Sequence, residues 1–570
     1  MQKQKKRGRI LRHAPLHCMN GLVILNLVQG TNVMKRQQQM IRYEKDQHAF
    51  ETDHLLRPGP LEFMRRFVVC ALWGTLAATT VHAAPAAGAQ RNGLAAVREL
   101  KIENGRIGFA EYSDAPVMTL PNGNALSNLP PRTIVKLVLC PAKGSMIQVE
   151  IWLPTAQKWN GRFLGLGNGG AAGRITPNGL AGGLCGGYAT ATTDMGTAPD
   201  ASSGIGNPEV WKDFGFRATH LMTVCAKQII KAYYDKEPAY AYFNGGSTGG
   251  QQALQEAQRY PDDYDGIVAS VPAHCRTPLH AYFLWNAQIF HKCPFTHSQQ
   301  TNIISAANTY MASREIPQTA DKIVSDPRCD ANDIEAVIKL ARERDPTLTD
   351  AHAEALRKLF DGPQSTLTGE RIFNGIPLGS SFRSSDGNLY LFNWVFGAQK
   401  DLMTIDFGKD IDTYTSALGP YLNAENPDLR PFERRGNKMI MISGSADPCV
   451  PYHATLDYYE RVVERFGSLD KVRSFLRYYI IPGKSHGSDG PGINTLPDLL
   501  GLVSEWREKG IVPNKLQGRR IGNNKTELDI PLYPYPSKTG WTSEQGFQAI
   551  DGPRGGVERV AERFRPSAAE

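Results

Sequence analysis

Zinc-binding cysteine spacings are missing from this chain of 570 residues. None of its nine cysteines stands in a Cys-X-X-Cys or Cys-X-X-His pattern, the spacings typical of structural zinc sites. Seven cysteines lie beyond residue 83, and an odd number leaves at least one thiol outside any disulfide within the chain. The sequence leaves the pairing open, although export would permit disulfides. We expect neither a metal nor another cofactor.

Membrane-length apolar runs and an excess of charge are also missing. The apolar patch at residues 22–28 is far shorter than the roughly 20 residues that cross a bilayer. Residues 84–570 hold 51 Lys+Arg and 51 Asp+Glu, so the net charge of +8 resides wholly in residues 1–83. A balanced charge gives no support for nucleic acid or an anionic membrane as a partner.

Residues 64–83 predict a secretory signal peptide. A basic start at Met64-Arg65-Arg66 precedes an apolar run at 67–81 and a small residue, Ala83, at the expected cleavage point. We therefore interpret residues 1–63 as an upstream extension foreign to the native protein. The expected location is secreted or periplasmic.

Residues 240–254 carry the strongest functional signal. The run 241–243 predicts a buried strand, Gly245-Gly246-Ser247-Thr248-Gly249 fits Gly-X-Ser-X-Gly, and residues 251–260 predict a helix. Strand, sharp turn and helix are the context in which this motif presents a nucleophilic serine. The alternative is a glycine-rich turn without chemistry.

A second match to the motif surrounds Ser485, at residues 483–487. In an α/β-hydrolase the acid and then the histidine follow the serine along the chain. No histidine lies beyond His486, so Ser485 cannot begin that order, whereas Ser247 can.

Strands and helices alternate on both sides of the motif, which predicts an α/β fold with a mostly parallel sheet covered on both faces. The expected strands are 134–139 and 146–153, antiparallel at a sheet edge, then 159–167, 187–194, 241–243, 265–272, 437–447 and 475–482. Helices are expected at 216–234, 251–260, 454–466 and 497–509.

The alternation stops between residues 275 and 435. This segment mixes helical stretches at 333–344 and 349–360 with aromatic loops such as 389–394, and it is too long for a simple connection. We interpret it as a lid domain. It would be inserted between residues 84–274 and residues 436–570, the two parts of an α/β-hydrolase core, the second with a C-terminal tail. The lid's aromatic residues are expected either to line a pocket or to form its own core.

Three candidate catalytic residues each follow an apolar strand. Ser247, Asp447 and His486 stand in the order serine, acid, histidine. The histidine would take the proton of the serine hydroxyl, and the aspartate would orient the imidazole and stabilise its charged form.

Three other histidines compete with His486. His453 is close to Asp447 in sequence but falls at the start of an expected helix, where a surface or pocket-lining position is expected. His274 and His280 follow the serine before any candidate acid, which does not fit the order.

An oxyanion formed at Ser247 would need N–H donors. The amide of Thr248, the residue after the serine, is one expected donor. The glycine-rich loop after strand 159–167 offers a second through Gly169 or Gly170. The sequence does not decide which of these amides points inward, and the alternative is a flexible turn.

Taken together, these motifs resemble the tannase and feruloyl esterase family of secreted α/β-hydrolases, which includes mono(hydroxyethyl) terephthalate hydrolases. The stretches that carry the resemblance are 153–154, 159–164, 167–170, 187–194, 242–250, 256–267, 447–448, 458–459, 482–483 and His486. The resemblance implies a serine carboxylic-ester hydrolase. Its small-molecule substrates would be esters of aromatic acids: feruloyl or other hydroxycinnamoyl, galloyl or terephthalate-type.

The chain departs from the family where cysteines are expected. The family places one cysteine before the serine and another after the histidine, joined by a disulfide, but this chain has Gly246 and Gly487 there. A further family cysteine near the C-terminus is replaced by Tyr533. The resemblance therefore implies a histidine loop that is less constrained than in the family.

The chain also departs from the calcium-binding pattern of many members. Residues 314–330 contain Asp321, Asp326 and Asp330 but neither the glycines nor the spacing of the family's loop. Because a hard cation needs several oxygens converging on a turn, we expect no calcium there.

Two other functions fit the same residues. The protein would be an acyltransferase if an acceptor other than water took the acyl group from Ser247. It would be a secreted binding protein if the hydrolase scaffold had lost its turnover, because a fold alone does not fix function. The oligomeric state is not readable from the sequence.

Overall fold

A computed structural model describes residues 84–170, 173–314, 327–381, 388–487, 490–542 and 544–567. The expected upstream extension and signal peptide, residues 1–83, lie outside this part of the chain. Asp321 and Asp326 also lie outside it. No helix within the described ranges is long and apolar enough to span a membrane.

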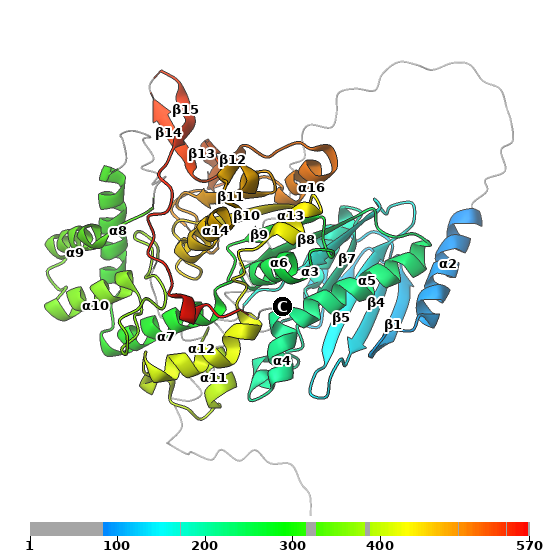
Figure 1. Cartoon of the computed structure of the whole chain (residues 1–570). Coiled ribbons are helices and arrows are strands. Elements are labelled where there is room, and N and C mark those ends of the chain that lie inside the picture. The colour runs from blue at the N-terminus through cyan, green and yellow to red at the C-terminus, as the bar shows by residue number, and fades with distance from the viewer. Residues whose placement is uncertain are drawn as a thin grey trace, which may run out of the picture. The chain divides into compact units, whose positions relative to one another are not determined.

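The centre of the fold is a nine-stranded mixed sheet (Figure 1). Its strands, in spatial order, are β1 (Gly105–Ser113), β4 (Arg132–Leu139), β5 (Ile147–Pro154), β7 (Ala189–Thr193), β6 (Arg162–Leu166), β8 (Tyr240–Gly246), β9 (Gly266–Ser270), β10 (Lys438–Gly444) and β11 (Leu476–Ile481). The pairs from β7 to β11 are all parallel, whereas β1, β4, β5 and β7 pair antiparallel. The predicted α/β fold is therefore confirmed.

The sheet edge differs from the prediction. β4 and β5 are antiparallel as expected, but the edge strand is β1, which the sequence did not indicate. Ala110 is the one buried residue of β1, so this strand lacks the apolar alternation by which a half-buried strand is recognised.

Helices cover both faces of the sheet because alternate strand residues point to opposite sides. On one face, Met439 and Met441 join a core with α5 (Ala218–Tyr234), α6 (Thr248–Arg259) and α14 (Tyr452–Phe466). On the other, Ile440 and Ile442 pack with α16 (Leu499–Lys509), and Trp152 packs with α3 (Pro177–Cys185). The helix α2 (Ala84–Glu99) precedes the first strand. Shorter helical elements are α4 (Pro208–Lys212), α15 (Leu469–Arg473), η1 (Ala201–Gly204), the π-type turn η2 (Asp213–Arg217), η4 (Leu402–Thr404) and η5 (Glu562–Phe564).

The chain between β9 and β10 is a helical insertion. Its helices are α7 (Arg276–Lys292), α8 (His297–Arg314), α9 (Ala331–Arg344), α10 (Asp350–Asp361), α11 (Tyr390–Phe396), α12 (Lys409–Leu422) and α13 (Arg430–Arg434). The helices predicted at 333–344 and 349–360 are confirmed as α9 and α10. The prediction of an aromatic loop at 389–394 is wrong, because the helix α11 begins at Tyr390. Leu279, Trp394 and Leu418 belong to the same buried cluster as one face of the sheet, so the insertion shares its core with the sheet.

Asp330, one of the aspartates weighed as a calcium ligand, caps a helix instead. Its carboxylate accepts the backbone N–H groups of Asn332 and Asp333, and the Asp333 side chain accepts the Asp330 N–H. This reciprocal capping box fixes the start of α9.

The C-terminal part adds two hairpins that the sequence reading did not predict. They are β12 (Leu516–Gly522) with β13 (Lys525–Leu532), and β14 (Ser537–Thr542) with β15 (Gly546–Asp551). Leu516 and Ile530 pack in the same apolar cluster as α16. A two-residue pair, β2 (Met118–Thr119) with β3 (Ala125–Leu126), lies near the start of the described chain.

A buried ionic network joins the insertion to the sheet core. Glu425, at the end of the insertion, binds His274 after β9 at 2.5 Å and also binds Arg461 of α14. The carboxylate of Asp457, also on α14, accepts a hydrogen bond from Arg461 Nε at 3.3 Å. It lies 3.9 Å from the guanidinium of Arg565 in the C-terminal segment. Burial alone would raise the pKa of Glu425, but the charges of Arg461 and His274 outweigh it and hold that pKa at about 2.

Replacing Glu425 by glutamine is expected to destabilise the protein by about 3 kcal/mol at pH 7, because the buried Arg461 loses one of its two carboxylate partners. A carboxyl whose pKa is lower in the folded than in the unfolded state stabilises the fold above its unfolded pKa, and this contribution is lost as the pH falls toward 2. Urea unfolding at pH 7 and pH 3 tests this, since the difference between wild type and variant must shrink at the lower pH.

The matched control is Glu335→Gln, which removes an exposed ion pair with Arg357. Such pairs contribute less than about 1 kcal/mol. Equal losses in the two variants would contradict a special role for the buried network.

Candidate active site

Ser247 lies at the sharp turn between β8 and α6. Its backbone has φ 57° and ψ −116°, a conformation that residues other than glycine rarely adopt. The turn is held by the neighbouring strand, because Ser247 N–H donates to Ser270 O at 2.9 Å and Ala273 N–H donates to Ser247 O at 3.0 Å. This geometry lifts the serine side chain beyond the carboxyl end of β8.

Glycines make the turn possible because three backbone segments touch there. A Cβ added to Gly245 would lie 2.3 Å from Gly249 O, and one added to Gly167 would lie 2.6 Å from Gly249 Cα. Gly246 differs, since the nearest atom to an added Cβ would be 3.6 Å away. The sharp turn at residues 245–249, here called the elbow, therefore requires glycine at position 245. Gly246 has room for a side chain.

The structure brings Ser247, His486 and Asp447 together from three loops. His486 Nε2 lies 3.1 Å from Ser247 Oγ, and its Nδ1 lies 2.8 Å from Asp447 Oδ2. Asp447 follows β10 and His486 follows β11, two parallel strands whose carboxyl ends meet at one edge of the sheet.

The carboxylate of Asp447 is buried and fixed by the backbone. Its Oδ1 accepts the N–H groups of Cys449 at 2.8 Å and Val450 at 2.9 Å, and its side chain is fully buried. With Oδ1 held by the backbone, Oδ2 is the oxygen that faces His486. An orienting acid in a proton-transfer relay needs this arrangement.

All three competing histidines are buried side chains. His274 Nδ1 binds Glu425 at 2.5 Å. His280 is buried on α7, and burial lowers its pKa well below the usual value. Of the two positions expected for His453, surface or pocket-lining, the surface is wrong: the residue is buried at the start of α14, where burial and then Arg371 lower its pKa to about 3. Ser485, the serine of the second motif, lies in the loop after β11.

The glycine loop after β6 is tied to the elbow through Asn168. Asn168 N–H donates to Gln252 Oε1 at 2.8 Å, and Asn168 O accepts Gly249 N–H at 2.6 Å. Gly170 O accepts the hydroxyl of Thr248 at 2.8 Å. The loop that carries Gly169 and Gly170 is thereby fixed beside the first turn of α6.

Thr248 is the first residue of α6. The N–H groups of a first helical turn have no carbonyl one turn back to bind, and the positive end of the helix dipole favours negative charge there. The amide expected to bind an oxyanion therefore stands at the position in the helix that suits an anion.

This arrangement can be compared with known proteins. A model of the family described as tannase and feruloyl esterase matches residues 135–398 and 387–551. The chain belongs to this family.

Relatives and solved structures agree with the assignment to the tannase and feruloyl esterase family. An uncharacterised esterase of Xanthomonas campestris is 29% identical over 524 residues, which cover 80% of this chain and 91% of that protein. Feruloyl esterase B of Aspergillus niger is 28% identical over 414 residues, 67% of this chain and 78% of that protein. The protein is thus a carboxylic ester hydrolase.

Two solved structures show the same fold at low identity. Feruloyl esterase B from Aspergillus oryzae has a TM-score of 0.68 at 22% identity and covers 81% of this chain and 100% of that one. Tannin acyl hydrolase from Aspergillus niger has a TM-score of 0.68 at 18% identity, covering 83% and 98%. These likenesses confirm the predicted α/β-hydrolase fold.

Among the described residues, Cys140, Cys185, Cys225, Cys275 and Cys293 are free thiols. Gly246 and Gly487 stand where the family resemblance implies cysteines, so no disulfide joins the serine and histidine loops through these positions. His486 is held by hydrogen bonds to Asp447 and Ser247.

One group of possible metal ligands occurs within the described ranges, although the sequence predicted none. Single ligand atoms of His220, Glu256 and Asp263 all lie within 4.8 Å of one another. His220 Nδ1 already binds Asp263 Oδ2 at 2.7 Å. Burial, and next the charge of Asp263, raise the pKa of Glu256 well above its usual value, so a proton rather than a cation suits this carboxyl.

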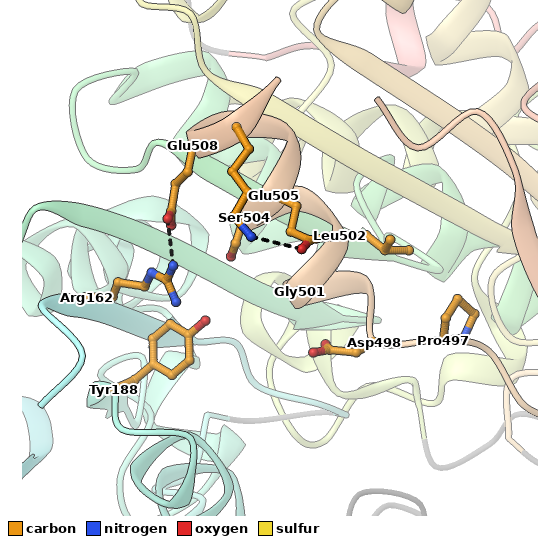
Figure 2. Close-up of a pocket in the computed structure, with 10 residues that line it drawn as sticks. Arg162, Tyr188, Pro497, Asp498, Gly501, Leu502, Ser504, Glu505 and Glu508 are labelled. Atoms are coloured by element: carbon orange, nitrogen blue, oxygen red, sulfur yellow. Dashed lines mark hydrogen bonds and ion pairs between the residues drawn. The ribbon is translucent and has the colours of Figure 1, made fainter. Parts of the chain in front are cut away.

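One groove lies away from the triad, along α16. Its volume is about 430 Å³, and neither triad nor glycine-loop residues line it. Figure 2 shows Arg162 pointing toward Glu508 across it, and these side chains form an ion pair at 2.6 Å. Arg162 pairs with Tyr240, the first residue of β8, so it lies roughly 23 Å along the strand from Ser247.

Sequence reasoning missed Asn168, Gln252 and Arg276, which fix the site. Gln252 stands inside the predicted helix at 251–260, whereas Arg276 begins α7, which the sequence did not indicate. Nothing in the local pattern marks either residue. The one usable signal was Asn168, a polar residue directly after a predicted strand and before two glycines.

Gly245→Ala is expected to destabilise the protein by about 1–3 kcal/mol and to reduce ester hydrolysis, because its new methyl group overlaps Gly249 O. Gly246→Ala is the control, since its methyl group meets no atom closer than 3.6 Å. Thermal unfolding and hydrolysis of p-nitrophenyl acetate measure both effects. Similar losses in the two variants would contradict the proposed backbone contact.

Exhaustive dialysis against a chelator is expected to leave both activity and melting temperature unchanged. The physical reason is that burial and the charge of Asp263 raise the pKa of Glu256, which disfavours the carboxylate form that would bind a cation. A loss that a divalent cation restores, and that Glu256→Gln abolishes, would instead place a metal on His220, Glu256 and Asp263.

Proposed function

We propose that the protein is a secreted serine esterase that hydrolyses esters of aromatic acids through an acyl-enzyme on Ser247. The observation that carries this proposal is the position of His486, whose two ring nitrogens lie 3.1 Å from Ser247 Oγ and 2.8 Å from Asp447 Oδ2. Secretion rests on the signal-like sequence at residues 64–83.

Acylation begins with proton transfer from Ser247 to His486 Nε2 as Oγ attacks the ester carbonyl carbon. The carbonyl oxygen becomes negative and accepts N–H groups of Thr248 and of Gly169 or Gly170. His486 then gives its proton to the departing alcohol oxygen, and an acyl group remains on Ser247. Asp447 stabilises the imidazolium that exists between these transfers.

Deacylation repeats the sequence with water. His486 takes a proton from water, whose oxygen attacks the acyl carbon, and the proton returns to Ser247 as the acid departs. No step needs a metal or a redox group, because the proton donor, the proton acceptor and the nucleophile are all side chains.

The aromatic acyl group is proposed from the names of the relatives. Feruloyl esterase B and tannin acyl hydrolase are named for feruloyl esters and tannins. Terephthalate-type esters complete the candidates implied by the family resemblance.

We also propose that residues 275–435 act as a lid over the acyl site. Tyr390 of α11 supports this, because its hydroxyl binds Arg276 at 2.6 Å, and Arg276 in turn binds Thr248 at 3.0 Å. The insertion thereby reaches the residue next to Ser247.

The test is hydrolysis of methyl ferulate, methyl gallate, mono(hydroxyethyl) terephthalate and p-nitrophenyl acetate by the full chain and by Ser247→Ala. Turnover of at least one aromatic ester is expected, with kcat lower by at least about 10⁴-fold in the variant. Asp447→Asn is expected to lower kcat by about 10⁴-fold, because the imidazole loses its orienting carboxylate.

Other results identify the alternatives. Equal turnover by Ser247→Ala would remove Ser247 from the mechanism. Faster ester formation with an added alcohol than hydrolysis in water would identify an acyltransferase. Tight binding of the esters without turnover by the wild type would identify a binding protein.

A further inference from the structure

Arg276, the first residue of α7, is buried beside Ser247. It is 3% exposed, and no carboxylate partner occurs for it in the described part of the chain. Its guanidinium Nη1 donates to Thr248 Oγ1 at 3.0 Å, and Nη2 donates to the Tyr390 hydroxyl at 2.6 Å and, at a long 3.5 Å, to Gly170 O. Its Nε is buried without a hydrogen-bond partner among the described residues.

A buried guanidinium without an anion is costly, because several kcal/mol of hydration are lost and no counter-charge replaces them. The ring of Phe214, 5.4 Å from the guanidinium carbon, offsets part of this cost. The uncompensated positive charge of Arg276 would favour a negative group that forms beside it only during the reaction.

The contacts of Arg276 join both segments that the proposed mechanism uses for the oxyanion. Thr248 carries one N–H donor, and the glycine loop carries the other. The Thr248 hydroxyl accepts from Arg276 and donates to Gly170 O at 2.8 Å. One side chain therefore fixes the spacing of the two donors.

We propose that Arg276 is a positioning residue of the oxyanion hole, which holds Thr248 and the Gly170 loop in place and supplies a fixed positive charge behind them. This inference rests on the proposed serine mechanism. When Ser247 Oγ bonds to the carbonyl carbon, the carbon–oxygen π pair moves onto oxygen and His486 takes the serine proton. Arg276 exchanges no proton; its charge lowers the energy of the negative oxygen in a site of low dielectric.

Arg132 provides a matched control. It is 1% exposed, its Nε is also unpartnered within the described ranges, and it lies over Trp152 at 5.3 Å. Its Nη1 binds backbone carbonyls of Ala115 and Pro130, so its contacts are local. It begins β4, four strands from β8, which is about 19 Å at the usual strand spacing.

The experiment compares Arg276→Met, Arg276→Lys and Arg132→Met in the full chain. It measures kcat and KM for an uncharged aromatic ester, melting temperature, and inhibition by phenylboronic acid, which forms a negatively charged tetrahedral adduct with a serine. Losing one oxyanion donor lowers kcat by 10²–10³-fold, so loss of a group that positions the donors is expected to lower it by about 10–100-fold. KM should stay within about threefold, and the boronate should bind more weakly by the same factor as kcat.

The other variants separate charge from packing. Arg276→Lys keeps the positive charge but lacks the planar guanidinium with its several N–H donors. Its kcat should lie between those of the wild type and Arg276→Met. Guanidinium ion should restore activity to Arg276→Ala. Arg132→Met should lower the melting temperature with kcat unchanged. If Arg276→Met does not fold, Tyr390→Phe replaces it, with an expected twofold to tenfold loss of kcat, about the effect of one hydrogen bond.

Several results would overturn the inference. These are wild-type kcat in a folded Arg276→Met, a change confined to KM, or unchanged boronate binding. Labelling of Ser247 by a fluorophosphonate distinguishes the two proposals. If the wild type is not labelled, the serine mechanism itself is wrong. If the wild type is labelled and turns over the ester, and Arg276→Met has the same kcat, only the positioning role is wrong.

Discussion

Everything at the site depends on the contact between the backbone after β6 and the backbone around the elbow. Gly167 meets Gly245 and Gly249 with no room for a Cβ on any of them. Because the two segments touch directly, Ser247 is forced into its unusual φ of 57°, and the loop of Gly169 and Gly170 is brought beside α6. Strain of this kind persists only where the surroundings over-determine it, and here two neighbouring strands do so.

The site could be predicted from the sequence to the extent that each residue has a local signal. Ser247, Asp447 and His486 each follow an apolar strand, and parallel strands bring their carboxyl ends to one edge, so chain order alone indicated the group. Arg276 has no such signal, because its contact with Tyr390 spans 114 residues. In the fold, β1 was missed because it is mostly exposed, and α11 because its seven residues, rich in large aromatic rings, show no helical periodicity.

The insertion contacts the sheet core near its start and near its end. Arg276, the first residue of α7, binds Thr248 of α6, and Glu425, near the end of the insertion, binds His274 after β9. The same buried apolar cluster continues from the sheet into the insertion. Lifting the whole insertion would expose that cluster and separate Arg461 from Glu425, one of its two carboxylate partners. Opening of the insertion as one rigid body would therefore be costly.

Gly246 and Gly487 give the protein a property that a bridged active site does not have. With no thiol beside the serine or the histidine, the hydrogen bonds of His486 form without any oxidation step. Neither glutathione nor a disulfide isomerase has a substrate at these positions. The hydrogen bonds that join Ser247, His486 and Asp447 therefore do not depend on a disulfide between residues 246 and 487.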